Sequence, residues 1–498
     1  MKKLRYTFIL VFFFVYLVPN GLSQTKKDLF ANTLKEYAQS QKEQSFLGNY
    51  MGGKKVGWDS EFSKIILFEG KEALKLTQQS YFIAKFAGQK SVSQETIETI
   101  YSLDGHGDIL QVNQFQNENG FKKNKKLFME SGRYFLKSSF DKSTQQKEVS
   151  KPKENLSTHL KLVQWLNSEL KPGSEFSCHT TALEEDDFNV PTKFIFKKYE
   201  IQEKDGTRGY PVVDQITHGA IFTSVLDYKA NVIHGRMGNL LELRKETEIQ
   251  AKKIPEPLVD LMEISSIKLD KPLGDPRSVE FLRLQVQATN QLEIPESHRQ
   301  VFKVIENDMY EVILLKDYFI KQPFKLPFET RKLYLQSTNN ITSDSPKITK
   351  IAKEIIGETK GEFEKAAKLC KWVYGKLDKT MAANSESALE VLSKMKGDCT
   401  EHSLLFVTLA RSIGIPAREV GGLAYMDSDP PRLAWHAWAE IYDGKQWITC
   451  DPTWNQVLVD ATHWKFSEGP TDMNWLNVFG GLQVRVKEFK KSDPNKQD

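Results

Sequence analysis

Short alternating runs of hydrophobic and polar residues fill the first half of the chain, from about residue 26 to residue 252. The runs are rich in β-branched and aromatic side chains, and turn-forming residues separate them. Four of these turns have the composition of hairpin loops: 52–57, 104–108, 131–133 and 205–209. We therefore expect an antiparallel β-rich region of one or more domains over 24–255, interrupted by helical patterns only near 26–42 and 158–170.

The pattern changes in the second half of the chain. Residues 256–335 still alternate, which predicts a β-rich connecting domain. Long amphipathic segments then follow, and we expect a domain of mixed helices and strands over 336–485. Within it, apolar residues at three- and four-residue steps predict a helix over 361–377 that buries Cys370. The polar end of the chain, 486–498, is expected to be a disordered tail.

The first residues have the three parts of an export signal. Basic residues come first, an apolar run follows from Thr7 to Val18, and a Pro-Asn-Gly turn precedes Ser23. We expect a signal peptide over 1–23 with cleavage after Ser23, and an uncleaved anchor is the alternative. The apolar run is about 12 residues long, short of the ~20 that a membrane-spanning helix needs. We therefore expect an exported protein, periplasmic or extracellular, with no stable membrane span after signal removal.

Composition excludes several classes of protein. With 498 residues, of which 40% are hydrophobic and 27% charged, the chain has enough apolar material for two or three packed domains. The formal net charge is +4, and three positive charges lie within the first five residues, so 4 − 3 = 1 positive charge remains without them. This balance gives no reason to expect nucleic acid as a partner. The four cysteines are too few for a disulfide framework, so a thiol is available for chemistry.

One cysteine, Cys399, lies at a predicted helix start. Asp398 and Glu401 have the spacing of a capping box, in which each side chain accepts a hydrogen bond from a backbone amide. The helix is expected to end at Gly414, with Pro416 beyond it. Cys399 thus occupies the first helical position, where unpaired amides and the helix dipole stabilise a thiolate. We interpret this thiol as reactive, and a buried small residue at a helix start is the alternative.

A hairpin further along the chain is expected to bring a histidine and an aspartate together. Residues 435–442 and 445–451 have the pattern of two strands around an Asp-Gly turn. A two-residue loop at positions 443 and 444 pairs residues whose numbers add to 887, which places His436 directly opposite Asp451. Opposed residues share one face with β-carbons ~5 Å apart, so the carboxylate can accept a hydrogen bond from the imidazole. A slip of one residue would turn the two side chains to opposite faces.

These residues predict a Cys-His-Asp arrangement. Cys399 is the expected nucleophile, His436 the general base and then acid, and Asp451 the carboxylate that orients the ring. For Asp451, the alternative is a turn start before Pro452. For His402, on the same helix as Cys399, we expect a structural or supporting role.

The remaining cysteines and histidines are not expected to do chemistry. Adjacent Cys178 and His179 would point to opposite faces of a strand. His463 and the other histidines lack ligand spacing with cysteines or carboxylates, and the chain has no calcium loop of the Asp-x-Asp-x-Asp-Gly kind. We therefore expect no metal and no cofactor.

Four segments around these residues resemble the core of the transglutaminase-like superfamily: 396–405, 410–418, 436–438 and 451–453. The resemblance covers about residues 340–470 and implies a papain-like fold with Cys399, His436 and Asp451 as its triad. The fold class that we expect is multidomain, with a β-rich antiparallel N-terminal region followed by an α+β transglutaminase-like core. The family often has an apolar residue where this chain has Cys450, which we expect to pack in the core.

The resemblance also implies acyl chemistry on amides through a thioester. We expect an exported cysteine enzyme that acts on amide or peptide bonds, and we favour hydrolysis by a peptidase or amidase over cross-linking. Two alternatives stay open: a non-catalytic binding or scaffold protein with this fold, and a protein cross-linking transglutaminase. The expected substrate is a protein or peptide, cell-wall peptides included. The backbone amide of Cys399 is the expected oxyanion donor, and no side chain stands out as a second one.

Overall fold

The computed structural model describes most of the chain. The described residues are 34–39, 44–140, 143–183, 186–200, 209–289, 291–380, 385, 387–469, 474–478 and 480–493. The chain divides into two compact units, one that ends at Ile264 and one that begins at Ser265. The expected signal peptide, 1–23, lies outside the described residues. Among the described residues, no helix has both the length and the apolar character needed to cross a membrane.

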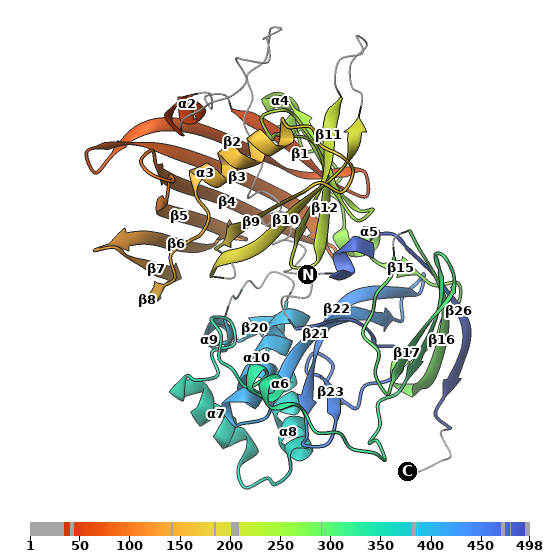
Figure 1. The fold of residues 1–498 in the computed structure, drawn as a ribbon. Helices are drawn as coiled ribbons and strands as arrows, with labels where there is room; N and C mark the ends of the chain where they lie inside the picture. The colour runs from red at the N-terminus through yellow and green to blue at the C-terminus, as the bar shows by residue number, and fades with distance from the viewer. Residues whose placement is uncertain are drawn as a thin grey trace. The chain divides into compact units, whose positions relative to one another are not determined.

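The first unit is built on one antiparallel sheet, which has fourteen strands within the described residues (Figure 1). The strands are β1 (Ser45–Met51), β2 (Lys54–Phe68), β3 (Lys71–Phe86), β4 (Gln89–Ser102), β5 (Ile109–Glu118), β6 (Phe121–Glu130), β7 (Arg133–Phe140), β8 (Ser143–Val149), β9 (Glu175–Ala182), β10 (Asp187–Glu200), β11 (Tyr210–Thr217), β12 (Ala220–Leu226), β13 (Val232–Met237) and β14 (Leu241–Glu246). Their order is β8-β7-β6-β5-β4-β3-β2-β1-β14-β13-β12-β11-β10-β9. Strands that follow one another along the chain therefore pair with one another, except that β8 and β9 form the two edges of the sheet, and β14 pairs with β1. The predicted β-rich antiparallel region is confirmed.

Short helices accompany this sheet. They are α2 (Leu34–Gln39), α3 (Leu156–Leu166) and α4 (Glu248–Lys252), and α5 (Leu261–Ser265) lies at the junction of the two units. Helix α3 begins after Asn155, whose side chain accepts a hydrogen bond from Thr158 N at 3.0 Å, and it confirms the helix predicted near 158–170. The helix predicted near 26–42 is described only over α2, and the rest of that segment lies outside the described residues.

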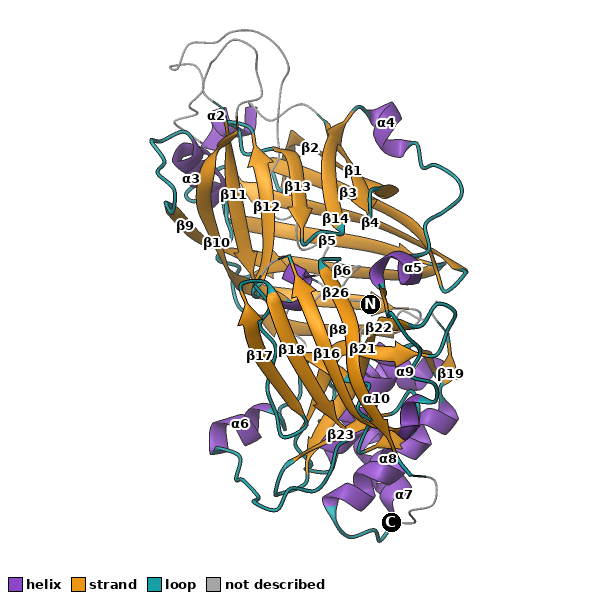
Figure 2. Ribbon diagram, turned by 90° about the vertical axis from the view of Figure 1, so that its right-hand side faces the viewer, coloured by secondary structure: helices purple, strands orange, loops and turns teal. Residues whose placement is uncertain are grey.

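The second unit combines helices with small sheets (Figure 2). Its helices are α6 (Phe328–Leu333), α7 (Pro346–Ile356), α8 (Glu362–Lys376), α9 (Ala388–Lys394) and α10 (Cys399–Ser412), with single turns η2 (Pro276–Ser278) and η3 (Asn474–Val478). The sheet beside α10 has the order β24 (Gln456–Val457), β23 (Trp447–Asp451), β22 (Arg432–Tyr442), β21 (Ala417–Met426), β25 (Trp464–Glu468), and β15 (Ile267–Lys268) also pairs with β22. A second sheet has the order β17 (Gln300–Glu306), β18 (Met309–Leu315), β16 (Val279–Ala288), β26 (Leu482–Lys491), and β19 (Asp378–Lys379) pairs with β20 (Lys396–Gly397).

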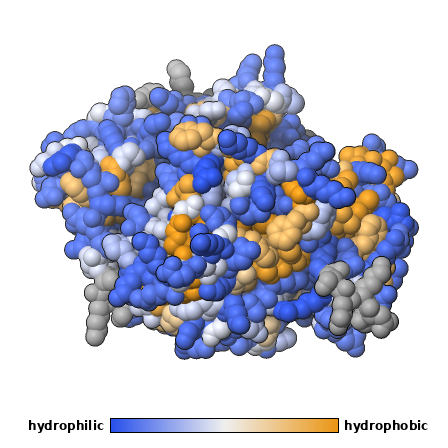
Figure 3. All heavy atoms as spheres, turned by 90° about the horizontal axis from the view of Figure 1, so that it is seen from below, coloured by the Kyte–Doolittle hydropathy of each residue, from blue (hydrophilic) through white to orange (hydrophobic). Residues whose placement is uncertain are grey.

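Helix α10 is the centre of this unit. It packs against β21 and β22 of the sheet and against helices α7, α8 and α9, and its residues 401–411 are all buried. The apolar core around it includes Cys370 and Cys450, as predicted. The helices predicted over 361–377 and from Cys399 onward are confirmed as α8 and α10. Hydrophilic side chains cover most of the face drawn in Figure 3, and apolar side chains gather near its centre and toward its right-hand side.

Two parts of this unit differ from what the sequence pattern suggested. Strands β16, β17 and β18 come from the expected connecting segment, 256–335, but β16 pairs with β26 near the end of the chain. They therefore lie in the same compact unit as the helices. Strand β26 continues to Lys491, so the expected tail, 486–498, begins as strand. The pairing orders this polar segment because alternate residues, Val484 and Val486, are buried.

Candidate active site

The amino end of α10 is held by the predicted capping box. Asp398 Oδ1 accepts a hydrogen bond from Thr400 N at 2.7 Å, and Glu401 Oε2 accepts one from Asp398 N at 2.9 Å. Cys399 is therefore the first residue of the helix, with 8% of its surface exposed. Free amides and the helix dipole at this position favour negative charge.

The hairpin that carries His436 and Asp451 is paired differently from the prediction. Glu440 pairs with Thr449, so the numbers of paired residues add to 440 + 449 = 889 rather than 887. The predicted direct opposition of His436 and Asp451 is therefore wrong. The shift is two residues, and because side chains alternate with a period of two, both residues still point to the same face.

The difference arises in the loop, which has four residues, 443–446, between the strands. Asp443 Oδ1 accepts hydrogen bonds from the amides of residues 445 and 446, each at 2.8 Å. Gln446 is buried, and its side-chain amide forms hydrogen bonds with the backbone of Tyr318 and Ile320. This contact with a distant segment keeps Gln446 in the loop and out of the ladder.

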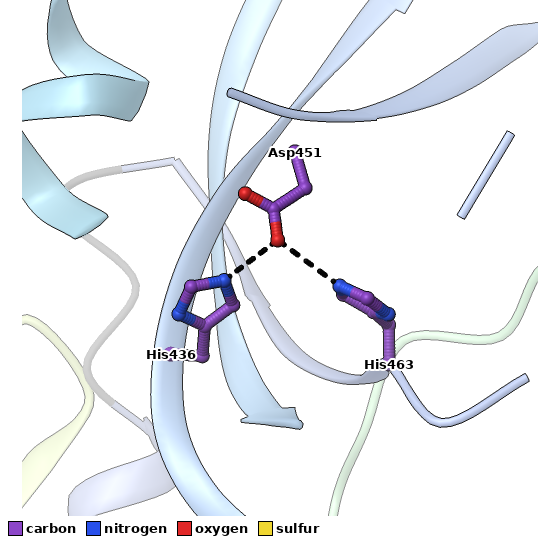
Figure 4. A group of neighbouring side chains, drawn as sticks. All are labelled: His436, Asp451 and His463. Atoms are coloured by element: carbon purple, nitrogen blue, oxygen red, sulfur yellow. Dashed lines mark hydrogen bonds and ion pairs between the residues drawn. The ribbon is translucent and has the colours of Figure 1, made fainter. Parts of the chain in front are cut away.

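The structure brings the three predicted site residues together. His436 Nε2 lies 2.8 Å from Asp451 Oδ2 (Figure 4). The Cys399 side chain also acts on the His436 ring and raises its pKa. One imidazole ring therefore links the sulfur at the start of α10 to a carboxylate at the end of β23.

His436 and Asp451 each stabilise the charged form of the other. Burial by itself would lower the pKa of His436, but the charge and hydrogen bond of Asp451, together with the contact with Cys399, raise it to about 10. Burial would raise the pKa of Asp451, but His436 and a second histidine, His463, hold it well below its ordinary value. At neutral pH, His436 is therefore an imidazolium that faces an ionised carboxylate.

Four donors surround the Asp451 carboxylate. Oδ2 faces both His436 Nε2 and His463 Nε2, the latter at 3.2 Å. Oδ1 accepts hydrogen bonds from the amides of Thr453, at 2.8 Å, and Trp454, at 3.2 Å. Both oxygens are thus occupied, which fixes the plane of the carboxylate.

Residues 349–452 match the family described as the transglutaminase-like superfamily. These residues form a transglutaminase-like domain. No curated protein matches the chain. Two solved structures show weak likeness, a "putative cysteine protease from Cytophaga hutchinsonii" and a "putative protease from Parabacteroides distasonis ATCC 8503". The first is 20% identical with a TM-score of 0.30 and covers 44% of this chain and 93% of its own. The second is 11% identical with a TM-score of 0.19 and covers 70% of this chain and 68% of its own. At these values neither structure bears on the reaction.

His463 is the site residue that sequence reasoning missed. It follows the matched segment of the transglutaminase-like domain, and its ring is fully buried between Asp451 and Asp460, with Nδ1 3.3 Å from Asp460 Oδ1. Metal-ligand spacing does not reveal His463, because its ring contacts the carboxylates of Asp451 and Asp460 as a hydrogen-bond donor. The one nearby residue that suggests a buried, paired histidine is Asp460, three residues earlier. Its presence does not predict that His463 also contacts Asp451.

Aromatic side chains enclose the imidazole of the transglutaminase-like domain. The half-buried ring of Trp454 stacks on His436, with centroids 4.2 Å apart and an angle of 13° between the planes. Trp438 is fully buried, and the centroid of its ring lies 6.1 Å from that of His436. The stacked indole keeps water from one face of the imidazolium and stabilises its charge.

His402 has the subordinate position that the sequence suggested. Its Nδ1 donates to the backbone oxygen of Asp398 at 2.7 Å, one helical turn earlier. Its Nε2 makes no hydrogen bond within the described part of the chain. Burial, first among several influences, lowers the pKa of this ring, so His402 is neutral at pH 7.

His436, Asp451 and His463 are the group within the described residues that offers several metal-ligand atoms, all within 4.8 Å of one another. A metal ion held there would replace both hydrogen bonds that Asp451 Oδ2 accepts. The distances of 2.8 Å and 3.2 Å are those of hydrogen bonds, and both nitrogens already face the carboxylate. The arrangement therefore fits proton transfer, with imidazoles as donors and the carboxylate as acceptor.

Proposed function

We propose that this chain is an exported cysteine enzyme that hydrolyses amide or peptide bonds through a thioester. The observation that carries the proposal is that the ring of His436 contacts both Cys399 and Asp451. This is the arrangement that activates a thiol nucleophile and orients its base. The transglutaminase-like domain supports the same chemistry.

In the first half of the proposed reaction, the thiolate of Cys399 attacks the carbonyl carbon of the amide. The oxyanion that forms accepts a hydrogen bond from the backbone amide of Cys399, at the start of α10. His436, which carries a proton at neutral pH, gives that proton to the leaving amine as the C–N bond breaks. The acyl group then remains on the sulfur as a thioester.

In the second half, neutral His436 takes a proton from water, and the resulting hydroxide equivalent attacks the thioester carbonyl. The C–S bond breaks, a carboxylic acid leaves, and Cys399 and His436 return to their starting charges. Water is the favoured acceptor because only 8% of Cys399 and 7% of the His436 side chain are exposed, which disfavours a bulky protein amine.

The decisive experiment is to trap the acyl group on Cys399 and identify it by mass spectrometry. The full chain is exposed to peptide and protein extracts, cell-wall peptides included, and quenched in acid. We expect an adduct on Cys399, none on Cys399→Ala, and release of a free amine. Iodoacetamide modification of Cys399 at a rate no higher than that of a model thiol would contradict the proposal and favour a binding or scaffold protein. Incorporation of a fluorescent amine into a protein glutamine would favour cross-linking.

Export is a further part of the proposal. The basic start and the apolar run of the first 23 residues support it. Sequencing the amino terminus of the protein from its native host, in medium, periplasmic and cytoplasmic fractions, tests both the site and the compartment. A chain that begins at residue 24 in an exported fraction is expected, and an intact Met1 in the cytoplasm would contradict it.

A further inference from the structure

His463 lies between two carboxylates in the interior of the second unit. Its Nε2 is 3.2 Å from Asp451 Oδ2, and its Nδ1 is 3.3 Å from Asp460 Oδ1. The side chains of His463 and Asp451 are fully buried, and that of Asp460 is 2% exposed. Together with the contacts of His436, these bonds form a continuous row: Asp460, His463, Asp451, His436 and Cys399.

The two contacts of the His463 ring require a charge on it. An ionised carboxylate only accepts hydrogen bonds, so each ring nitrogen that faces one must carry a proton. A neutral imidazole has one N–H and can satisfy only one of the two carboxylates. Burial would lower the pKa of His463, but Asp460 and Asp451 raise it, and the pKa of Asp460 is lowered to about 2. His463 is therefore an imidazolium, and charges alternate from Asp460 through His463 and Asp451 to His436.

The segment that carries His463 is held rigidly in place. Arg299 donates through Nη2 to the backbone oxygens of His463, at 2.9 Å, and Asp460, at 3.1 Å. Asp460 Oδ1 accepts from Thr462 N at 2.8 Å, and Asp460 Oδ2 accepts from Gln456 Nε2 at 3.0 Å. Both contacts keep the Asp460 carboxylate beside the ring. These hydrogen bonds therefore fix the position of the His463 ring.

We propose that His463 is a positioning residue for the Cys399 reaction, whose positive charge shares the Asp451 carboxylate with His436 and so keeps the His436 proton transferable. The inference rests on the proposed function. Asp451 Oδ2 faces both rings, whose centroids are 6.1 Å apart, and each positive ring weakens the hold of the carboxylate on the other. Without the charge of His463, the full charge of Asp451 would act on His436, and the leaving amine would receive its proton more slowly.

Further charged groups surround the row. His436 faces Cys399 and Asp451, and the backbone oxygen of Asp451 is contacted by Cys370 Sγ. Beyond them lie the groups that act on Arg299 and His402, which are Asp317, Glu440, Lys379 and Glu401. These groups are present in every variant below, so a change in titration can be assigned to the row.

The first test uses the unmodified full chain. Nitrogen NMR of the histidine rings at pH 7 is expected to show both nitrogens of His463 protonated, with the resonance assigned by correlation to the backbone of residue 463 in the unmodified chain. A single protonated nitrogen would overturn the inference, and this result does not depend on whether any variant folds.

The second test compares His463→Gln and Asp460→Asn with His234→Gln, a control in the first unit whose ring is 42% exposed and pairs with Glu242. Glutamine can still donate to Asp451 but carries no charge. We expect the titration midpoint of His436 to rise by about one pH unit in His463→Gln, by less in Asp460→Asn, and not at all in the control. The alkaline inflection in the rate of Cys399 alkylation by iodoacetamide should move with it.

The outcomes separate the inference from the proposed function. Slow alkylation of Cys399 in the unmodified chain contradicts the proposed function itself. Fast alkylation, with a folded His463→Gln whose His436 midpoint is unchanged, contradicts only the role of His463 and makes it a packing residue. With an acyl donor in hand, His463→Gln is expected to lower kcat about tenfold at unchanged KM, because leaving-group protonation is affected and binding is not.

Discussion

Cys370 Sγ lies 3.4 Å from the backbone oxygen of Asp451. This contact joins α8, a helix of the apolar core, to the strand end that supplies the carboxylate of the candidate site. The core therefore supports the position of Asp451 directly, and one thiol of the chain serves packing while another is placed for chemistry.

The four cysteines are predicted to differ sharply in reactivity. Burial raises the pKa of Cys178 and of Cys370 to about 12, and burial raises that of Cys450 well above its ordinary value. Since the thiolate is the reactive form, iodoacetamide at pH 7 should modify Cys399 and leave the other three intact in the folded chain. Peptide mapping after brief labelling checks this, with urea-unfolded protein as the control in which all four react.

Asp451→Asn is expected to slow acyl transfer by roughly 10²- to 10⁴-fold. Both oxygens of Asp451 accept hydrogen bonds, so either orientation of an asparagine turns its amino group toward a donor. The release of p-nitrophenol from p-nitrophenyl acetate measures the rate. Asp344→Asn, at an exposed position of the second unit, is the control. An unchanged rate in Asp451→Asn would show that the carboxylate does not orient His436.

The second unit is predicted to lose stability as the pH rises above neutrality. The pKa of His436 is about 10 in the folded chain, against 6.5 as its ordinary value. Its protonation therefore stabilises the fold fully below pH 6.5, and this contribution disappears as the pH rises through 10. The free energy of unfolding in urea, followed by tryptophan fluorescence, should fall between these values by a few kcal/mol at most. His436→Gln should show a flatter dependence, and equal slopes would refute the assignment.

The first unit should also lose stability with rising pH, through a different group. Asp59 is buried in β2, and burial raises its pKa to about 7 from an ordinary 3.8. The folded chain therefore binds a proton that the unfolded chain has released between these values, so stability falls from pH 4 to pH 7. Asp59→Asn should flatten that part of the melting-temperature profile. Asp104→Asn, whose native side chain is 76% exposed, should leave it unchanged.

Gly397 is predicted to be irreplaceable just before the α10 cap. A β-carbon at this position would lie 2.2 Å from the β-carbon of Glu401, the residue that completes the capping box. Gly397→Ala should therefore destabilise the second unit by about 1–3 kcal/mol and slow Cys399 labelling. Gly375→Ala in α8 is the control, since no atom lies within 4 Å of a β-carbon there. Comparable urea midpoints for the two variants would contradict the steric argument.

Local signals predicted much of the site. The capping box at Asp398 and the stop at Gly414 depend on residues within one turn of each other, and α10 begins and ends accordingly. The hairpin was located correctly, but its loop length was not. Hydrogen bonds with the backbone of Tyr318 and Ile320, more than a hundred residues earlier in the chain, hold Gln446 in the loop. The sequence of residues 443–446 does not predict these contacts.

The sequence by itself determined the helix that presents Cys399, the strands that present His436 and Asp451, and the face that those two share, because capping and side-chain alternation act over a few neighbouring residues. Alternation has a period of two, so the shared face survived a two-residue error in pairing. Tertiary structure alone decided that Cys399 meets His436, that His463 completes the surroundings of Asp451, and that β14 closes on β1. These contacts join residues far apart in the chain, and their free energy comes from burial and charge in the packed interior.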